Sequence, residues 1–443
     1  MSERKIDLLG ASSVVVANMI GTGVFVSLGY QLLDLHSGFP IIALWLVGGV
    51  LALCGAVSYA ELATRMPEDG GEYYFLGRVY HPAIGFMAGF VSSTVGFAAP
   101  IAMAGAALGA YAKGVFPGVN GTLFGAAVIL GIGLIHLINV STGVRFQKVF
   151  TIIKVLLISV FILAGLFHGN SQNYTFGMQT GVWDEIFSSK FAIALVFVSY
   201  AYSGWNASAY LAGEIKHPEK NLSRSILYGA GLVTIFYVLI NIVFLMVAPA
   251  QEMMVDVSNF APKEVGLISA NYIFGVLGGK IMGGVICILL ISTISAMIIA
   301  GPRVIQPMFA KLPLVNAIAK TDKSGNPIYA IIFQTALALG ILFTGSFSSI
   351  INYIGFTLTI FTLLTVAGVI VFRFRHGKPT GYKAWLYPIT PMLFIIVNIG
   401  ICFYQFQDKT TASLLGLGTA ALGGLLYFIS SDHLKQKNNS ISQ

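Results

Sequence analysis

The chain has 443 residues, of which 56% are hydrophobic and only 9% are charged. Soluble globular proteins carry roughly 25% charged residues, so this composition excludes an ordinary soluble domain and predicts an integral membrane protein. The net charge of +8 calls for no nucleic-acid partner, because most of the basic residues lie in loops on one side of the predicted membrane segments.

Apolar segments of about 20 residues recur along the whole chain, and each is long enough to cross a hydrocarbon core about 30 Å thick. Residues 1–7 are too short to supply a cleavable signal peptide, so we expect the first segment to stay in the membrane. We predict an all-α integral membrane protein with twelve transmembrane helices. Their approximate bounds are 8–30, 39–64, 83–112, 122–140, 148–168, 189–211, 225–249, 279–301, 328–345, 348–372, 385–404 and 412–431.

The distribution of Lys and Arg predicts how these spans are oriented. Nineteen of these residues lie on the side that holds both termini, and five lie in the loops of the other side. The positive-inside rule therefore places both termini in the cytoplasm. On the opposite side, loop 250–278 mixes polar and apolar residues and is expected to hold an interfacial or lid-like helix.

Two spans are interrupted by residues that hold a helix poorly. Gly21-Thr22-Gly23 divides span 1, and Ala201-Tyr202-Ser203-Gly204-Trp205-Asn206 divides span 6. A helix break in hydrocarbon leaves peptide groups without partners at several kcal/mol each, so it is tolerated where protein, water or a polar ligand meets those groups. Breaks at corresponding positions of two inverted halves indicate the binding site of a transporter. The alternative is a close helix-packing surface made of small residues.

Five motifs carry a family resemblance that covers essentially the whole chain. They are IGTGVF in span 1, PEDGGEYYF at 67–75, SYAYSGWNASAYLAGEIKHPEKNLSRSI at span 6, SAMIIAGPRV at 295–304 and INYIGFTLTIFTLLTVAG at 351–368. The sequence resembles the amino acid–polyamine–organocation (APC) superfamily. Within it, the sequence is similar to the L-type amino acid transporter branch and its bacterial alanine–serine–cysteine and serine/threonine exchangers.

The resemblance implies a leucine-transporter fold and a bacterial inner (plasma) membrane location. Residues 1–168 and 189–372 would form two inverted repeats of five spans each. Residues 385–431 would add two peripheral spans, and residues 432–443 would form a cytoplasmic tail.

An amino acid zwitterion suits a broken helix, because free N–H groups attract its carboxylate and free carbonyls attract its ammonium. We expect the N–H groups of Thr22, Gly23 and Val24 to face the carboxylate. The carbonyls expected to face the ammonium are those of Ile20, Tyr200, Ala201 and Ser203. The resemblance implies the same assignment.

Other polar and aromatic residues are candidates for the wall of the site. By resemblance, Tyr200 is the aromatic lid over the substrate and Asn206 lines the pocket. Their structural alternatives are an aromatic packing residue and a helix cap. Tyr237 and Asn241 in span 7 are candidates for the far wall of the pocket. No acidic or basic side chain stands out as directed at the pocket, which argues against substrates with charged side chains.

Lys154 lies within span 5, where a charge costs about 2.5–3.5 kcal/mol on insertion scales and therefore indicates a role. The alternative is that its side chain snorkels to the cytoplasmic interface near Lys148. The resemblance implies that Lys154 fills a sodium position and links span 5 to the span 1 break and to span 8, which disfavours sodium coupling. Ser292, Thr293 and Ser295 are the possible partners on span 8.

Glu61 and Glu214, at the cytoplasmic ends of spans 2 and 6, are expected to pair with basic residues as an inner gate. A solvated helix end is the alternative for each of them. The chain has no nucleotide-binding loop, no nucleophile elbow and no cluster of Cys and His, so we expect no enzyme activity, no cofactor and no metal. Loop 113–121 lacks a cysteine, so no covalent heavy subunit is expected.

These features together predict a secondary transporter of neutral, small L-amino acids that works by alternating access, as a sodium-independent exchanger. The alternative within this class is a proton-coupled symporter in which Lys154 loses its proton when substrate binds. Alternatives from another class are a channel and a transporter-like nutrient sensor. An intramembrane enzyme is disfavoured, because no span pairs a nucleophile with a base.

Overall fold

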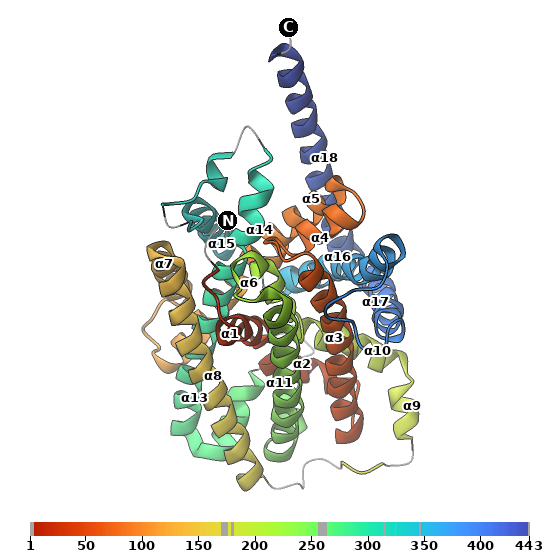
Figure 1. The fold of residues 1–443 in the computed structure, drawn as a ribbon. Coiled ribbons are helices and arrows are strands. Elements are labelled where there is room, and N and C mark those ends of the chain that lie inside the picture. Colours follow the sequence, from red (N-terminus) through yellow and green to blue (C-terminus); the bar gives the residue numbers. More distant parts are fainter. Residues whose placement is uncertain are drawn as a thin grey trace.

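The computed structural model describes residues 4–169, 176–178, 181–255, 264–312, 316–323, 325–344 and 347–441. Within these ranges the chain is helical without strands, and one parallel bridge joins Ile6 to Ile215. The predicted all-α class is therefore confirmed. Figure 1 shows that the helices pack side by side into one bundle and that α18 extends beyond the others.

The first half of the bundle contains twelve short and long helices. They are α1 (Leu8–Met19), α2 (Gly23–Gln31), α3 (Gly38–Arg65), α4 (Glu72–Val79), α5 (Pro82–Val91), the π-helix η1 (Ser92–Ala98), α6 (Ala99–Val115), α7 (Gly121–Ile138), α8 (Val140–His168), α9 (Val182–Ile186), α10 (Ser189–Ala201) and the 3₁₀-helix η2 (Ala207–Glu214). The second half continues from η2. It contains α11 (Pro218–Val247), α12 (Ala250–Met253), α13 (Val265–Ala300), α14 (Pro302–Phe309), η3 (Asn316–Ala319), α15 (Ile328–Thr344), α16 (Phe347–His376), α17 (Ile389–Asp408) and α18 (Thr410–Ile441).

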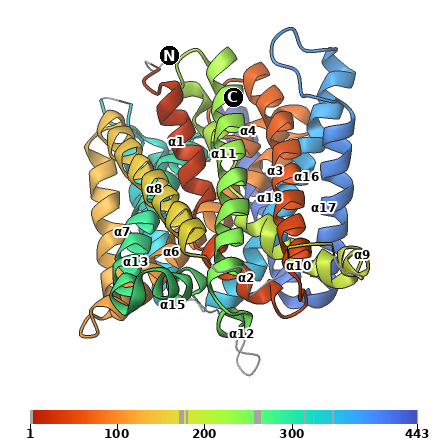
Figure 2. The ribbon, with the colours of Figure 1, turned by 90° about the horizontal axis from the view of Figure 1, so that it is seen from below.

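Ten described helical segments are long and apolar enough to cross a bilayer, in agreement with a multi-pass membrane protein. Two shorter apolar helices, α10 and α15, stand where spans 6 and 9 are predicted. The total of twelve crossings and the inverted repeats therefore stay predictions. In Figure 2, α1 begins near the upper edge of the bundle and α12 lies at the lower edge, so they mark its two ends.

Both predicted interruptions are present. The first helix ends at Met19 and resumes at Gly23 as α2, and α10 ends at Ala201. After the second interruption the chain differs from expectation, because a turn leads into a 3₁₀-helix, Ala207–Glu214, rather than into an α-helix. The tighter i→i+3 winding is a common way to continue a chain rich in turn-forming residues.

Three segments that were predicted to be loops or tail contain helix. Helix α4 lies in the predicted loop 65–82 and brings Glu72 into the bundle. The lid-like helix expected in loop 250–278 is the first part of α13, which is set off by a non-helical Gly275 (φ 73°), and residues 256–263 of that loop lie outside the described residues. Helix α18 continues to Ile441, so most of the predicted tail is helical.

An aromatic cluster packs behind the two breaks and fixes the elements around them. Trp45 on α3 meets Tyr237 on α11 edge-on at 5.4 Å between ring centroids, and Tyr202 lies 4.9 Å from Tyr237. The Tyr202 hydroxyl donates to the Trp45 carbonyl at 3.0 Å. Such contacts add about 0.5–1.5 kcal/mol per aromatic pair beyond area burial, and so hold α3 and α11 against the second break.

Candidate functional site

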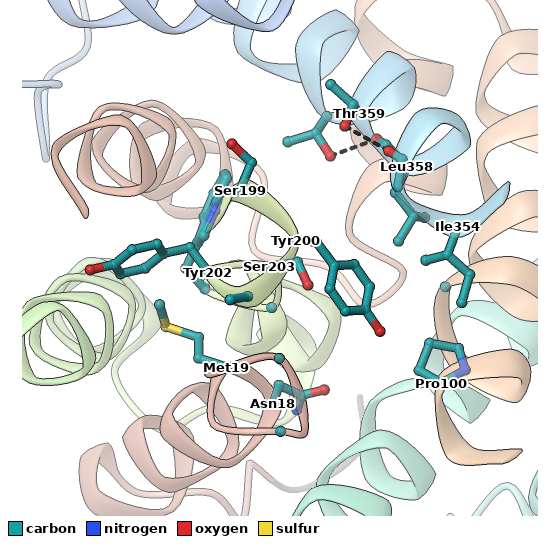
Figure 3. A pocket seen from close by; sticks show the side chains of 18 of the residues that line it. Asn18, Met19, Pro100, Ser199, Tyr200, Tyr202, Ser203, Ile354, Leu358 and Thr359 are labelled. Atoms are coloured by element: carbon teal, nitrogen blue, oxygen red, sulfur yellow. Dashed lines mark hydrogen bonds between the residues drawn. The ribbon is translucent and has the colours of Figure 1, made fainter. Parts of the chain in front are cut away.

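The two breaks face one cavity of about 170 Å³ in the middle of the bundle. Residues of both breaks line it, together with side chains from α3, η1, α6, α13, α16 and α17. In Figure 3 the Tyr200 ring points from the second break toward Pro100 and Ile354, while Asn18 and Met19 lie on the side of the first break. The sequence-predicted pairing of the two breaks around one site is thus present in the structure.

Two glycines allow the breaks to touch. A Cβ on Gly23 would lie 2.9 Å from Ala201 Cα, closer than real Cβ contacts come. Gly204 has φ 98°, a conformation that L side chains rarely adopt, and a Cβ there would lie 2.9 Å from the carbonyl carbon of Asn18. Each break therefore supplies a glycine at the point where it meets the other.

The first break exposes N–H groups to the cavity. Among the described residues, the N–H groups of Thr22, Gly23 and Val24 have no backbone partner, whereas Phe25 already donates to the Thr22 carbonyl at 3.1 Å. Thr22 and Gly23 are partly exposed and line the cavity. Because these groups begin α2, they also carry the positive end of its dipole, an arrangement that attracts an anion such as a carboxylate.

Carbonyls of the first break accept hydrogen bonds from side chains of the protein. The Ile20 carbonyl accepts from Lys154 Nζ at 2.7 Å and from Thr293 Oγ1 at 2.8 Å, so both of its lone pairs are used. The single proton of the Tyr237 hydroxyl can go to the Met19 carbonyl at 2.5 Å or to the Ala201 carbonyl at 3.0 Å. An ammonium at Ile20, as the sequence suggested, would share an acceptor that protein donors already hold. The Ser203 carbonyl has no such partner within the described chain.

Lys154 joins three elements at the break. It is fully buried, and Nζ also donates to Thr293 Oγ1 at 2.9 Å and to the Ala17 carbonyl at 3.4 Å. The snorkelling alternative is therefore wrong, because the ammonium points into the bundle. On α13 the partner is Thr293. Ser292 bonds to Gln147 at 3.2 Å instead, and Ser295 bonds to His136 at 2.9 Å.

The remaining wall residues divide into those at the cavity and those behind it. Tyr200 and Asn206 line the cavity. Tyr237 and Asn241 do not: Tyr237 ties the two breaks together from behind, and Asn241 donates to the Tyr237 carbonyl at 2.7 Å. Their predicted place in the far wall is therefore wrong. Asn206 makes no helix cap, because its amide donates to side chains instead.

Glu72 is the site residue that the sequence interpretation missed. It is 2% exposed, it lines the cavity, and it corrects the expectation that no acidic group is directed there. Five neutral side chains lie within hydrogen-bonding distance of its carboxylate: Tyr59 (2.6 Å), Ser92 (3.2 Å), Asn206 (3.2 Å), Thr362 (3.5 Å) and Tyr210. Burial raises the pKa of the Glu72 carboxyl, and these hydrogen bonds oppose the rise. The only sequence signal was an acidic residue in the motif PEDGGEYYF, which lies in a predicted loop.

The predicted inner-gate residues Glu61 and Glu214 both form ion pairs, with Arg373 and Arg303, and none of these four residues lines the cavity. Glu61 is fully buried and accepts from Arg373 Nε at 2.7 Å, and Glu214 accepts from Arg303 Nε at 2.9 Å. The solvated-end alternative is therefore wrong for Glu61. Next to the second pair, Asp69 accepts from the Gly213 N–H at 2.8 Å. Burial, together with the charge of Glu214, raises the pKa of Asp69 to about 7.

The chain's N-terminal segment pairs with the backbone around Glu214. The Ile6 N–H donates to the Glu214 carbonyl at 2.9 Å, and the Lys216 N–H donates to the Ile6 carbonyl at 2.8 Å. Asp7 pairs with Lys148 at 2.6 Å. The segment before α1 and the segment after η2 are thus paired with each other, at the end of the bundle where α1 begins.

Comparison with known proteins gives a consistent result. A family model described as "Amino acid permease" matches residues 6–423. The serine/threonine exchanger SteT of Bacillus subtilis (strain 168) is 31% identical over 431 residues, which cover 96% of this chain and 95% of the relative. The b(0,+)-type amino acid transporter 1 of Homo sapiens is 26% identical, over 98% of this chain and 89% of the relative. The large neutral amino acids transporter small subunit 2 of Oryctolagus cuniculus is 27% identical, over 96% and 80%.

Gly23→Val should abolish substrate binding. The added side chain would clash with Ala201 and cover the N–H groups that begin α2. The control is Gly21→Ala, whose Cβ would meet only Thr293 Cγ2 at an ordinary 3.8 Å. The measurement is amino acid binding to purified, folded protein, and unchanged binding by Gly23→Val would remove the first break from the site.

Lys154→Met should lower exchange by more than about tenfold, because it leaves carbonyls of the break without their donor, at about 1–3 kcal/mol for each unsatisfied group. The matched control is Lys190→Met, which removes a lysine from a solvent-exposed pair with Asp34 and should change little. Counterflow and thermal unfolding of both variants check this. Wild-type activity in Lys154→Met would contradict the assigned role.

The packing of η2 around Asp69 should weaken as pH rises. A carboxyl with a raised pKa binds its proton more tightly in this packed arrangement than in water, so the arrangement loses stability between the ordinary pKa of 3.8 and about 7. The probe is the labelling rate of Ser208→Cys, a buried position in η2, with the three native cysteines changed to alanine.

The labelling rate should be compared between proteins that carry Asp69 and Asp69→Asn. The pH dependence of the thiol itself cancels in this ratio. We expect the ratio to rise several-fold as pH approaches 7. A ratio that is flat over this range would show that Asp69 does not titrate with opening.

Proposed function

Because the chain belongs to the amino acid permease family, we propose that it exchanges small neutral L-amino acids across a membrane by alternating access. One observation carries the proposal: three adjacent N–H groups at the break between α1 and α2 lack backbone partners among the described residues, and two of them belong to Thr22 and Gly23, which line the central cavity. Unpaired backbone donors at the start of a helix suit an anion, and every amino acid presents a carboxylate. A site made mostly of backbone accepts several side chains.

We place the substrate between the two breaks. Its carboxylate would accept from the N–H groups of Thr22, Gly23 and Val24, and its ammonium would donate to the carbonyl of Ser203 and share that of Tyr200. Its side chain would then extend toward α16, whose lining residues include Ile354, Leu358 and Thr362. The small volume of the cavity, about 170 Å³, favours short side chains. Tyr200 would cover the substrate as a lid.

The position of Lys154 supports sodium-independent transport. Its ammonium already supplies a fixed positive charge to the carbonyls of Ala17 and Ile20, the type of oxygen ligand that a bound sodium ion would use. A second cation there would be repelled by the ammonium. Exchange therefore takes its driving force from the amino acid gradients. In the proton-coupled alternative, Lys154 would lose its proton during each cycle and uptake would follow a pH gradient.

Two ion pairs between helices support alternating access over a channel. Glu61–Arg373 joins α3 to α16, and Glu214–Arg303 joins η2 to α14. We propose that they form an inner gate that opens when the outer side closes. We also propose a location in a bacterial inner membrane, with both termini in the cytoplasm and no covalently attached heavy subunit.

Counterflow in proteoliposomes tests the proposal. Liposomes loaded with unlabelled L-alanine should accumulate labelled L-alanine several-fold over empty liposomes, equally with sodium or choline outside and without a pH gradient. A requirement for sodium would contradict the role of Lys154. Uptake driven by a pH gradient into empty liposomes would favour the proton symporter, and unsaturable flux would indicate a channel.

A further inference from the structure

The Glu72 carboxylate is a buried negative charge that only neutral groups surround. Its five partners are three hydroxyls of the bundle core, the Tyr210 hydroxyl and one amide. Within the described residues, no lysine or arginine forms an ion pair with it. Several donors to one carboxylate stabilise its ionised form, and its charge is not cancelled by a cation. When Glu72 is ionised, which its burial opposes, the cavity has a negative end.

An ionised carboxylate only accepts hydrogen bonds, so it fixes the orientation of the polar groups around it. The Asn206 amide turns its Nδ2 toward Glu72 Oε1 and toward the Tyr210 hydroxyl, each at 3.2 Å. The Tyr210 hydroxyl uses its proton on Glu72. The Oδ1 atom of Asn206 has no partner among the described residues. Because Asn206 is partly exposed and lines the cavity, this oxygen is available to accept a hydrogen bond from a ligand.

Thr362 on α16 also presents a hydrogen-bond acceptor to the cavity. Its hydroxyl donates to the Leu358 carbonyl at 2.8 Å or to Glu72 at 3.5 Å, and both of these partners are acceptors. The lone pairs of Thr362 Oγ1 are what remains for a molecule in the cavity, which Thr362 also lines. The wall around Glu72 thus offers acceptors to a ligand and few donors.

We propose that this acceptor wall, set by Glu72, is a specificity subsite that favours small side chains with a hydrogen-bond donor and excludes side chains with a carboxylate. A hydroxyl or thiol donates to the wall, whereas a methyl group of the same size leaves Asn206 Oδ1 unpaired. A carboxylate side chain finds acceptors and a like charge. This inference rests on the proposed function, and it names the substrate class within it as neutral amino acids with serine-like side chains.

The test is competition against labelled L-alanine in the counterflow assay, at mildly alkaline pH so that Glu72 stays ionised. Serine and 2-aminobutyrate form a matched pair, because they differ by a hydroxyl in place of a methyl group. Wild-type protein should prefer serine by roughly fivefold, the value of one net hydrogen bond, and should not be inhibited by aspartate. In Glu72→Gln the preference should fall toward one, and aspartate should begin to compete.

Two controls separate charge from packing. Glu72→Asp keeps the charge and should keep the exclusion of aspartate. Ser92→Ala removes one donor to the same carboxylate, and because Ser92 does not line the cavity it should leave the serine preference unchanged even if the rate falls. If Glu72→Gln yields no folded protein, Thr362→Val removes one acceptor without a change in charge, and the serine preference should fall while aspartate stays excluded.

A folded Glu72→Gln protein that exchanges alanine with the wild-type preference and still excludes aspartate would overturn the inference. An unchanged preference in Thr362→Val would do the same. Both results would leave the proposed function intact, since alanine is still exchanged. A wild-type protein that exchanges no alanine would instead contradict the proposed function itself.

Discussion

The structure depends on the hydrogen bond from Lys154 Nζ to the Ile20 carbonyl. A carbonyl released by a broken helix costs several kcal/mol in a membrane interior, and a buried lysine costs about 2.5–3.5 kcal/mol on insertion scales. At 2.7 Å each group removes much of the other's penalty. Because Thr293 of α13 joins the same carbonyl, the contact also fixes three elements around the break: α8, α13 and the end of α1.

This contact decides which peptide groups of the first break have partners in the protein. The carbonyls of Met19 and Ile20 bond to Lys154, Thr293 and Tyr237, whereas the N–H groups at the start of α2 have no backbone partner among the described residues. The chain before α1 pairs with the chain after η2, and Glu214 at the end of η2 pairs with Arg303. The two breaks are therefore connected to these paired residues through two short helices, α1 and η2.

Much of this arrangement is predictable from local sequence. Gly21-Thr22-Gly23 and the turn-forming run at 201–206 predict the breaks, and Lys154 is conspicuous because a charge in an apolar span needs a partner. Partners on other helices are harder to predict. Ser292, Thr293 and Ser295 are all candidates by sequence, and only helix rotation makes Thr293 the one that meets Lys154. The sequence places Tyr237 near both breaks, but it predicts a position in the wall of the cavity. In the structure, Tyr237 lies outside the cavity lining and its hydroxyl bonds to carbonyls of the two breaks.

Glu72 shows the limit of sequence patterns. Glu72 follows Gly70 and Gly71, which both have positive φ. From the sequence alone, an acidic residue after two glycines is expected in a solvent-exposed loop. Only packing of α4 against α5 and α16 turns it inward toward Tyr59 and Thr362. The extension of α18 and the π-helical turn in span 3 also carry no local signal that distinguishes them from their surroundings.

The most direct test of the central claim is an experimental structure of the purified protein with a bound small neutral amino acid such as L-serine. The account predicts that the ligand carboxylate lies within hydrogen-bonding distance of the N–H groups of Thr22, Gly23 and Val24, with Lys154 still on the Ile20 carbonyl. A ligand bound elsewhere, or a first span that forms one continuous helix, would contradict it.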